Sequence, residues 1–292
     1  MKNGIIFSII TALLFTTHEP VSKLFASEIN PYAITAIRFL IGAFFLLPFS
    51  FSEIIKEKKH VTKKDLGIMT VLGILFICVS MVLLQVGVAV ADSPALIAIL
   101  FSSNSVFTIL LSAIFLRKKL TKTRITGVIL CIIAVVFSAD LTQGSNLLSI
   151  ILGILSALTF SVYTILCKKY LSHIGGVIQT GITFFIGSVI LLIILAILGI
   201  DILSDISSSN ILLVLYISVL VTGVGYWAYS LALKKGGPQI AAIAFFIKPI
   251  LTPLATFLIN GIVPNYTIII ALVFMIAGVF LCGGTYDNLK KK

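Results

Sequence analysis

The sequence predicts an all-α membrane protein with ten transmembrane helices, arranged as two inverted repeats of five helices each. Its 292 residues are 59% hydrophobic and only 11% charged, which leaves too few charges to cover a soluble domain of this length. Uncharged runs such as 66–91 and 174–200 are long enough to cross about 30 Å of hydrocarbon as helices. The two halves of the chain also resemble each other, which predicts the repeats.

The apolar runs do not alternate with polar residues, as the strands of a transmembrane β-barrel would. The first run follows Lys2 as in a signal peptide, but His18, Glu19 and Lys23 interrupt it and no small-residue cleavage site follows. We therefore expect this run to remain as the first span. The ten predicted spans are 4–24, 33–52, 66–89, 94–116, 124–139, 149–167, 176–199, 211–233, 238–259 and 266–284.

Basic residues gather on one predicted side of the membrane. Lysine and arginine cluster in the even-numbered loops, most densely at 56–64 and 117–124, and at both termini, whereas the odd-numbered loops contain acidic residues and no lysine or arginine. By the positive-inside rule, this distribution predicts a multi-pass protein of the cell membrane with cytoplasmic N- and C-termini. The net charge of +11 therefore reflects topology and contact with lipid head groups, and we expect no nucleic-acid partner.

The sequence predicts no metal, no cofactor and no catalytic residue. Its four cysteines lie inside or at the ends of spans and lack the spacing of a metal centre or a disulfide framework. The HEPVS stretch from His18 contains only part of the HExxH zinc-protease motif, because Ser22 stands where the second histidine would be. A GxxxxGK[ST] loop for ATP is also missing. These features argue against an enzyme and against direct ATP coupling.

Three pairs of segments match between the halves at a nearly constant shift. They are 11–15 with 156–160, 94–110 with 238–254, and 133–137 with 276–280, at shifts of 145, 144 and 143 residues. We therefore predict one five-helix repeat at 1–140 and a second at 146–292. Because five is odd, the second repeat must begin on the opposite side of the membrane. Inverted repeats place a binding site near the midplane and allow alternating access by rocking, so this architecture predicts a transporter.

Four segments resemble a known family: Ala12–Lys23, Pro31–Arg38, the GVGYWAYSLALKKGG run at 223–237, and Lys248-Pro249. With them, essentially the whole chain is similar to the EamA family of the drug/metabolite transporter superfamily. The resemblance implies ten helices in two inverted repeats and the export of small metabolites, such as amino acids or other carboxylate-bearing compounds. The chain departs from many relatives at Phe15-Thr16, where they have a tryptophan-glycine pair.

Four charged residues fall within the predicted spans: Glu19, Lys23, Arg38 and Lys248. A charge at the bilayer centre costs about 2.5–3.5 kcal/mol or more, so each is a functional candidate. Lys23 is near enough to the outer surface for its long side chain to reach the head groups. Glu19 and Arg38 lie at similar depth on adjacent helices, and we expect them to form a structural or gating ion pair. The alternative for Glu19 is contact with substrate or protons.

Two neighbours of Glu19 complete this group of candidates. His18 could titrate near neutral pH, but a hydrogen-bonded packing role is the simpler interpretation. Pro20 removes a helical hydrogen bond, so it could let the outer end of the first helix bend as a gate closes.

Lys248 and Asn104 superimpose at the shift of 144 residues. Each follows a helix-opening proline by ten residues, which places both about 15 Å deep, at the membrane midplane. Pro249 and Pro253 should kink the helix beside Lys248. We expect Lys248 to bind an anionic group of the substrate while Asn104 adds a hydrogen bond. The alternative is that Lys248 bonds to carbonyls freed by the two prolines.

Three aromatic residues complete the predicted binding site. Tyr163 and Tyr229 could line a pocket, because each combines an apolar ring with a hydroxyl. Trp227 is predicted either to line the pocket or to lie in the interfacial aromatic belt.

The leading interpretation is a secondary transporter that exports small metabolites by alternating access, with proton or exchange coupling, as a monomer or homodimer. Its partners are then the small-molecule substrate and the lipid bilayer. A channel or scaffold, or a carrier of drugs, sugar phosphates or nucleotide sugars, is the alternative.

Overall fold

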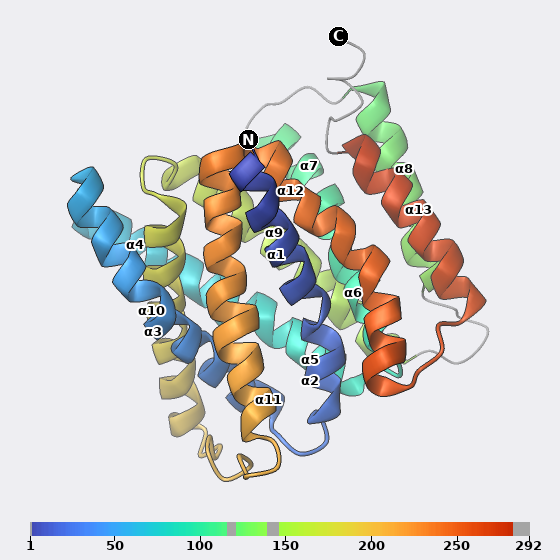
Figure 1. Cartoon of the computed structure of the whole chain (residues 1–292), viewed down its shortest axis with the longest axis horizontal. Coiled ribbons are helices and arrows are strands. Elements are labelled where there is room, and N and C mark those ends of the chain that lie inside the picture. Colours follow the sequence, from blue (N-terminus) through green and yellow to red (C-terminus); the bar gives the residue numbers. More distant parts are fainter. Residues whose placement is uncertain (1, 116–120, 139–145, 283–292) are drawn as a thin grey trace.

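The computed structural model describes residues 2–115, 121–138 and 146–282, and every regular element in these ranges is a helix (Figure 1). In chain order the elements are α1 (Lys2–Thr16), α2 (His18–Leu24), α3 (Pro31–Glu57), α4 (Lys63–Gly73), η1 (Ile74–Met81), α5 (Val82–Val90), α6 (Pro94–Ser102), α7 (Asn104–Phe115), α8 (Lys122–Ser138), α9 (Leu147–Tyr170), α10 (Gly176–Ile197), α11 (Ile211–Leu215), η2 (Tyr216–Val224), α12 (Gly225–Asn260) and α13 (Tyr266–Cys282). The prediction of an all-helical protein is confirmed.

Helical segments overlap each of the ten predicted spans. Eight are long and apolar enough to cross a membrane: Asn3–Leu24, Pro31–Glu57, Lys63–Val90, Pro94–Phe115, Leu147–Tyr170, Gly176–Ile197, Ile211–Gly237 and Ile243–Asn260. The other two, α8 and α13, have 17 residues each. At 1.5 Å per residue each is about 26 Å long, slightly less than a typical hydrocarbon core.

Local sequence signals set several helix ends. The Asn30 side chain accepts a hydrogen bond from the backbone N–H of Tyr32 and caps α3, whose first residue is a proline. Thr62 and Asp65 form a reciprocal capping box at the start of α4. Gly261, with φ at +70°, ends α12 in the left-handed conformation that glycine adopts without strain.

Two segments are π-helical, with backbone hydrogen bonds that reach one residue further than in an α-helix. They are η1 in the third span and η2 in the eighth, the two spans that the predicted repeats make equivalent. The Thr222 hydroxyl follows the same wider spacing and donates to the Ile217 carbonyl, five residues earlier. Such segments occur often at functional sites.

Helices from the two halves of the chain pack directly against each other. α3 packs against α10, α8 against α13, and α6 against α12. The α8–α13 pair forms one side of the molecule in Figure 1. The Ser50 hydroxyl on α3 donates to the Val177 carbonyl on α10 at 3.0 Å, a bond of the kind that joins helices where no water is present.

Glycines permit two especially close crossings between the halves. A Cβ atom at Gly187 would lie 2.6 Å from the Gly73 carbonyl oxygen, and one at Gly42 would lie 2.8 Å from the Thr222 methyl group. Gly42 and Gly187 are 145 residues apart, the shift that relates the two halves. Both crossings join the second helix of one half to the third helix of the other.

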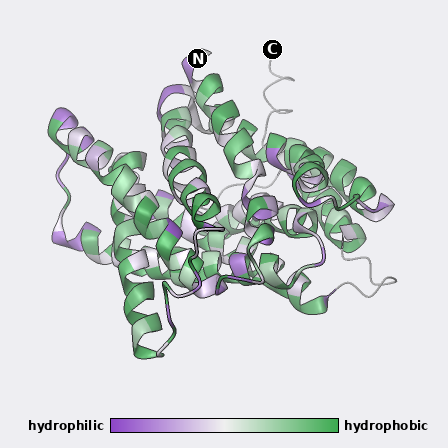
Figure 2. Cartoon of the chain, turned by 60° about the horizontal axis from the view of Figure 1, so that its bottom comes forward, coloured by the Kyte–Doolittle hydropathy of each residue, from purple (hydrophilic) through white to green (hydrophobic). Residues whose placement is uncertain are grey.

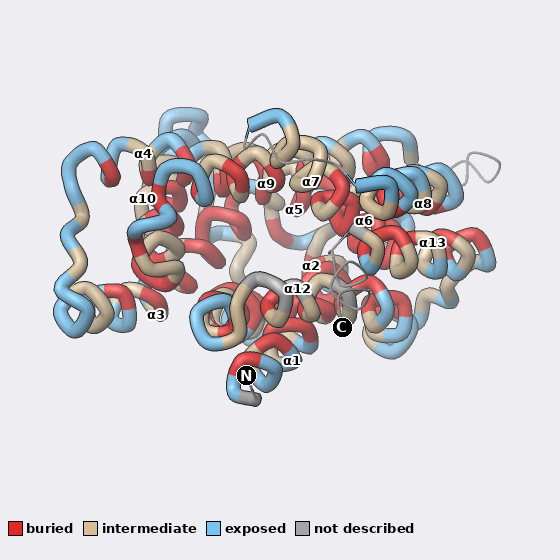
Figure 3. Tube along the Cα trace, turned by 90° about the horizontal axis from the view of Figure 1, so that it is seen from above, coloured by how far each residue is buried: buried red, intermediate tan, exposed pale blue. Residues whose placement is uncertain are grey.

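Most of the helical ribbon consists of hydrophobic residues, as the green colour in Figure 2 shows, and many of the large ones are exposed. Large hydrophobic side chains such as Ile55 and Ile197 are more than three-quarters exposed. The buried residues lie on the helices, where these pack against one another (Figure 3). Among them, the rings of Phe39, Phe76 and Phe184 form an aromatic cluster. An exposed apolar surface of this extent fits contact with lipid rather than with water.

Candidate functional site

A small cavity lies between helices from both halves of the chain. Its volume is about 30 Å³. A water molecule needs roughly 10–15 Å³, whereas pockets for drug-sized ligands measure about 300–1,000 Å³. The cavity therefore admits water but no metabolite in this conformation. Its lining residues are Phe15, His18, Arg38, Met81, Leu84, Phe101, Phe160, Val221, Thr222, Tyr226, Phe245 and Lys248.

Helical spacing directs several of these side chains to the same cavity. Thr222 and Tyr226 are four residues apart, and Phe245 and Lys248 are three apart, so each pair shares one helix face. The lining is mostly aromatic and aliphatic, with a histidine from α2, an arginine from α3 and a lysine from α12. An apolar pocket with a few convergent polar groups is typical of a small-molecule site.

The predicted ion pair between Glu19 and Arg38 is wrong in its partner. Glu19 pairs with Lys248 instead: Lys248 Nζ donates to Glu19 Oε1 at 2.5 Å. The Glu19 side chain is fully buried and Lys248 is 5% exposed. The two helices that hold them, α2 and α12, pack together, a proximity that the depth of each residue in its own span does not reveal.

The sequence offers Lys248 no acidic residue within its own helix, and the structure supplies Glu19 from α2. The lysine amine thus donates to a carboxylate, and the alternative that it bonds to carbonyls freed at Pro249 and Pro253 stays a prediction. Lys248 Nζ lies 5.2 Å from the centre of the Phe101 ring, a distance at which a cation is attracted by an aromatic face.

Arg38 lies beside the Glu19–Lys248 ion pair, and His18 lies between Arg38 and Glu19. Arg38 Nη1 donates to His18 Nε2, and Nη2 contacts the sulfur of Met81 at 3.7 Å. His18 Nδ1 in turn lies 3.7 Å from Glu19 Oε1. His18 thus makes the hydrogen-bonded contact expected of it, and Arg38, His18, Glu19 and Lys248 form one connected group.

Pro20 follows a break in the first span. Because Pro20 has no N–H, it cannot donate to the carbonyl four residues earlier, and the helix is interrupted at Thr17. The Thr17 hydroxyl donates to the Leu14 carbonyl and pairs with the Tyr216 hydroxyl at 2.8 Å. This break places His18 and Glu19 at the start of α2.

Pro249 and Pro253 lie in backbone that stays helical. The non-helical residue within α12 is Gly237, with φ at +79°, where the chain turns between the two arms of α12 seen in Figure 1. The gating role of Pro20 and the kinking role of the other two prolines stay predictions.

Asn104 and the predicted aromatic residues do not line the cavity. The Asn104 amide donates to the Phe101 carbonyl at 2.8 Å, within its own span. Tyr163 stacks on Phe76, and Tyr229 packs edge-on against Phe245. Trp227 contacts the rings of Phe7 and Phe49. Their substrate contacts stay predictions that would need a different conformation.

The cavity contains Tyr226, which the sequence analysis did not select. Its ring packs against Phe15 and Phe184, each at 4.9 Å between ring centres. The sequence feature that could have pointed to Tyr226 is the cluster of three aromatic residues at 226–229, but the sequence did not show which of the three faces inward. That depends on the rotation of the helix within its bundle.

The model of the EamA-like transporter family matches residues 2–139 and again residues 147–284. This chain belongs to the EamA-like transporter family. The resemblance noted in the sequence is thereby confirmed, and the chain is a membrane transporter.

Relatives of this EamA-like transporter come from bacteria and archaea. A Clostridium kluyveri protein named "Uncharacterized transporter" is 34% identical over 300 residues, covering 100% of this chain and 95% of the relative. The Bacillus subtilis protein "Uncharacterized transporter YdfC" is 24% identical, in an alignment that covers 90% of this chain and 84% of the relative. An Archaeoglobus fulgidus "Uncharacterized transporter" is 27% identical, in an alignment that covers 78% of this chain and 79% of the relative. A solved crystal structure superposes with a TM-score of 0.72 at 14% identity, covering 100% of this chain and 99% of that one, which shows a shared fold.

In the EamA-like transporter, ion pairs and a hydrogen bond also join the two halves of the chain near both ends of the helices. At the predicted cytoplasmic end, Lys234 of α12 binds Glu53 at 2.7 Å and also Glu57, both on α3. At the predicted outer end, Asn260 donates to the Pro20 carbonyl at 3.1 Å. Bonds between the two halves of the chain therefore lie on both sides of the cavity.

Lys23 is held near the predicted outer end. Its amine donates to the Ala89 and Ala91 carbonyls at 3.0 and 2.6 Å. Carbonyls at the end of a helix attract cations, so Lys23 stabilises the end of α5.

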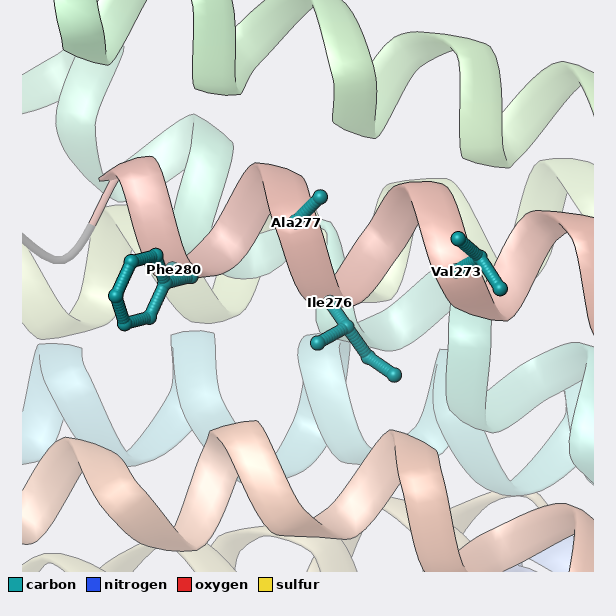
Figure 4. Close-up of a pocket in the computed structure, with 4 residues that line it drawn as sticks. All are labelled: Val273, Ile276, Ala277 and Phe280. Atoms are coloured by element: carbon teal, nitrogen blue, oxygen red, sulfur yellow. The ribbon is translucent and has the colours of Figure 1, made fainter.

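A second hollow lies along α13 and is lined by Val273, Ile276, Ala277 and Phe280 (Figure 4). None of these four side chains carries a polar group. A surface hollow of this composition can accommodate an acyl chain but offers nothing to orient a polar metabolite, so we do not assign the substrate to it.

Proposed function

We propose that this EamA-like transporter is a secondary carrier that exports small metabolites by alternating access around the cavity at Arg38 and Lys248. The observation that supports this most is a cavity of about 30 Å³ that contains charged groups from both halves of the chain. Charges within a bilayer are expensive and mark transport pathways. A metabolite can occupy this site only if the surrounding helices move apart.

The packing between the halves supports two inverted repeats, at 1–140 and 146–292. Under that proposal the second, fourth and fifth helices of each repeat pair with their counterparts, as α3–α10, α6–α12 and α8–α13 do. The close crossings at Gly42 and Gly187 and the π-helices η1 and η2 also occupy equivalent positions. Two equivalent elements of inverted repeats can exchange conformations when one repeat rocks against the other.

We further propose cytoplasmic termini in the cell membrane and transport out of the cell. The orientation is supported by the distribution of basic loops. The export direction is supported by the family resemblance. The protein acts as a monomer or a homodimer in this proposal.

Carboxylate-bearing compounds such as amino acids are the proposed substrates. Arg38 Nε and Glu19 Oε2 are both buried and have no hydrogen-bond partner in the structure. A free N–H donor and a free carboxylate oxygen complement the carboxylate and the ammonium group of an amino acid.

Coupling by protons or by exchange fits the same group of residues. Glu19 neutralises Lys248 while the cavity is too small for substrate. Protonation of Glu19, or binding of an anionic substrate to Lys248, would break the contact between these two residues. Either event would link the ion pair to transport.

Reconstitution into proteoliposomes tests the carrier proposal. We expect saturable uptake of a labelled amino acid mixture and acceleration when the same unlabelled compounds fill the lumen. The Gly67→Ala variant is a suitable control, since a Cβ atom there meets nothing within 4 Å. Flux that rises linearly with concentration and shows no counterflow would favour the alternative, a channel.

A further inference from the structure

The positive charge of Arg38 is not balanced by a carboxylate in the described part of the chain. Glu19 is the acidic residue in the group around the cavity, and its Oε1 binds Lys248. Within the described residues, Arg38 contacts His18, the sulfur of Met81 and the adjacent Phe39 ring. Counting Glu19 against Lys248 leaves one positive charge, and it belongs to Arg38.

His18 does not offset or add to this charge. An arginine guanidinium can only donate hydrogen bonds, so His18 Nε2 must be the acceptor and carries no proton. The proton of a neutral His18 is then on Nδ1, which faces Glu19 Oε1 at 3.7 Å. In this arrangement His18 is neutral and accepts a hydrogen bond from Arg38.

Arg38 is also unusually deep for an unpaired cation. It is only 3% exposed, it lines the cavity, and its Nε has no hydrogen-bond partner. A buried charge without a counter-ion is strongly unfavourable in a protein interior. A guanidinium presents parallel N–H groups that match the two oxygens of a carboxylate, so a bound carboxylate would remove this cost.

We propose that Arg38 is the residue that binds the negatively charged group of the substrate, and that this group is a carboxylate. The inference rests on the proposed carrier function and deepens it, because it assigns to Arg38 the anion site that the sequence alone suggests at Lys248. Lys248 serves as the counter-ion of Glu19. Arg38 then selects compounds that carry a carboxylate over the same compounds without one.

A binding experiment with matched ligands tests this assignment. Purified full-length protein is heated with each of the standard L-amino acids and with the corresponding L-amino acid amides, which keep the side chain and amino group but lack the negative charge. We expect stabilisation by a subset of the acids and none by their amides. No stabilisation by any acid, or equal stabilisation by acid and amide, overturns the proposal.

Variants then identify the residue responsible. Arg38→Gln should weaken binding of the stabilising acids by about 10- to 100-fold, the range for loss of a hydrogen bond to a charged group. Arg38→Lys should retain part of the affinity and the preference for acid over amide. Lys122→Gln, which removes a charge from an exposed position on α8, should bind like the wild type. Each variant is first checked for a single unfolding transition without ligand.

Two outcomes separate this proposal from the carrier proposal. If Lys248→Met removes the preference for acids while Arg38→Gln retains it, the anion site is at Lys248 and the Arg38 assignment is overturned. If acids bind through Arg38 but show no counterflow in proteoliposomes, the anion site stands and the carrier function fails.

Discussion

Lys248 and Glu19 are 229 residues apart in the chain, yet the lysine amine donates to the glutamate carboxylate at 2.5 Å in the interior of the protein. The bond joins α12 of the second half to α2 of the first, beside a cavity of about 30 Å³. Both side chains are buried, so each charge depends on the other for a partner. Opening the cavity for a metabolite must alter this contact or its surroundings.

The ion pair should be energetically coupled. Glu19→Gln and Lys248→Met each leave one buried charge without its partner, and each should destabilise the protein by about 3–5 kcal/mol. The double variant removes both charges and should recover most of that loss. Equilibrium unfolding of the four proteins in one detergent measures the coupling. The Glu19→Gln/Arg38→Gln double variant is the matched control, and we expect a smaller coupling for it; equal couplings would contradict the assignment of Lys248 as the partner.

The crossing of Gly187 with Gly73 should tolerate no added methyl group. Gly187→Ala would place a Cβ atom 2.6 Å from a backbone carbonyl oxygen, and neither backbone can yield without moving a helix. We expect a loss of about 1–3 kcal/mol of stability, as for other overpacked sites. Gly67→Ala meets nothing within 4 Å and should be neutral or stabilising by up to about 1 kcal/mol. Thermal unfolding of both variants checks this, and similar midpoints for the two would show that the crossing is not tight.

The bridge from Lys234 to Glu53 and Glu57 should affect conformation more than stability. The Lys234 side chain is 47% exposed, and exposed ion pairs contribute less than about 1 kcal/mol. Because the bridge joins α12 to α3 at the predicted cytoplasmic end, Lys234→Gln should favour opening on that side. A cysteine at Thr222 in a cysteine-free background should then react several-fold faster with a water-soluble maleimide added from the cytoplasmic side. Unchanged labelling, with Lys122→Gln as the control, would mean that the bridge does not hold this end closed.

The orientation of the chain is open to direct measurement. Reporters inserted within Lys56–Lys64 or fused after Lys292 should be cytoplasmic, and reporters within Asp201–Ser209 should be external, because the basic residues gather in the even-numbered loops. Alkaline phosphatase and green fluorescent protein fusions give opposite signals on the two sides. An external C-terminus would contradict both the even number of spans and the inverted repeat.

Much of the architecture was predictable because membrane insertion depends on local composition. A run of about 20 apolar residues lowers its free energy by entering the bilayer whatever its neighbours are, so helical segments could be located from the sequence. The same physics marked Glu19, Lys23, Arg38 and Lys248 as exceptional. The structure brings three of them together with His18 beside one cavity, whereas Lys23 bonds to carbonyls at the end of α5.

The pairings within that group were decided by tertiary structure alone. Depth along a span follows from counting residues, and it placed Glu19 level with Arg38. Which side chains meet also depends on which helices are neighbours and how each is rotated, and these follow from packing between segments far apart in the chain. For that reason Tyr226 faces the cavity while Trp227 and Tyr229 do not, and Glu19 pairs with Lys248. The sequence by itself determined the helical segments and the identities of the buried charges; contacts among distant helices determined that the unbalanced charge is Arg38.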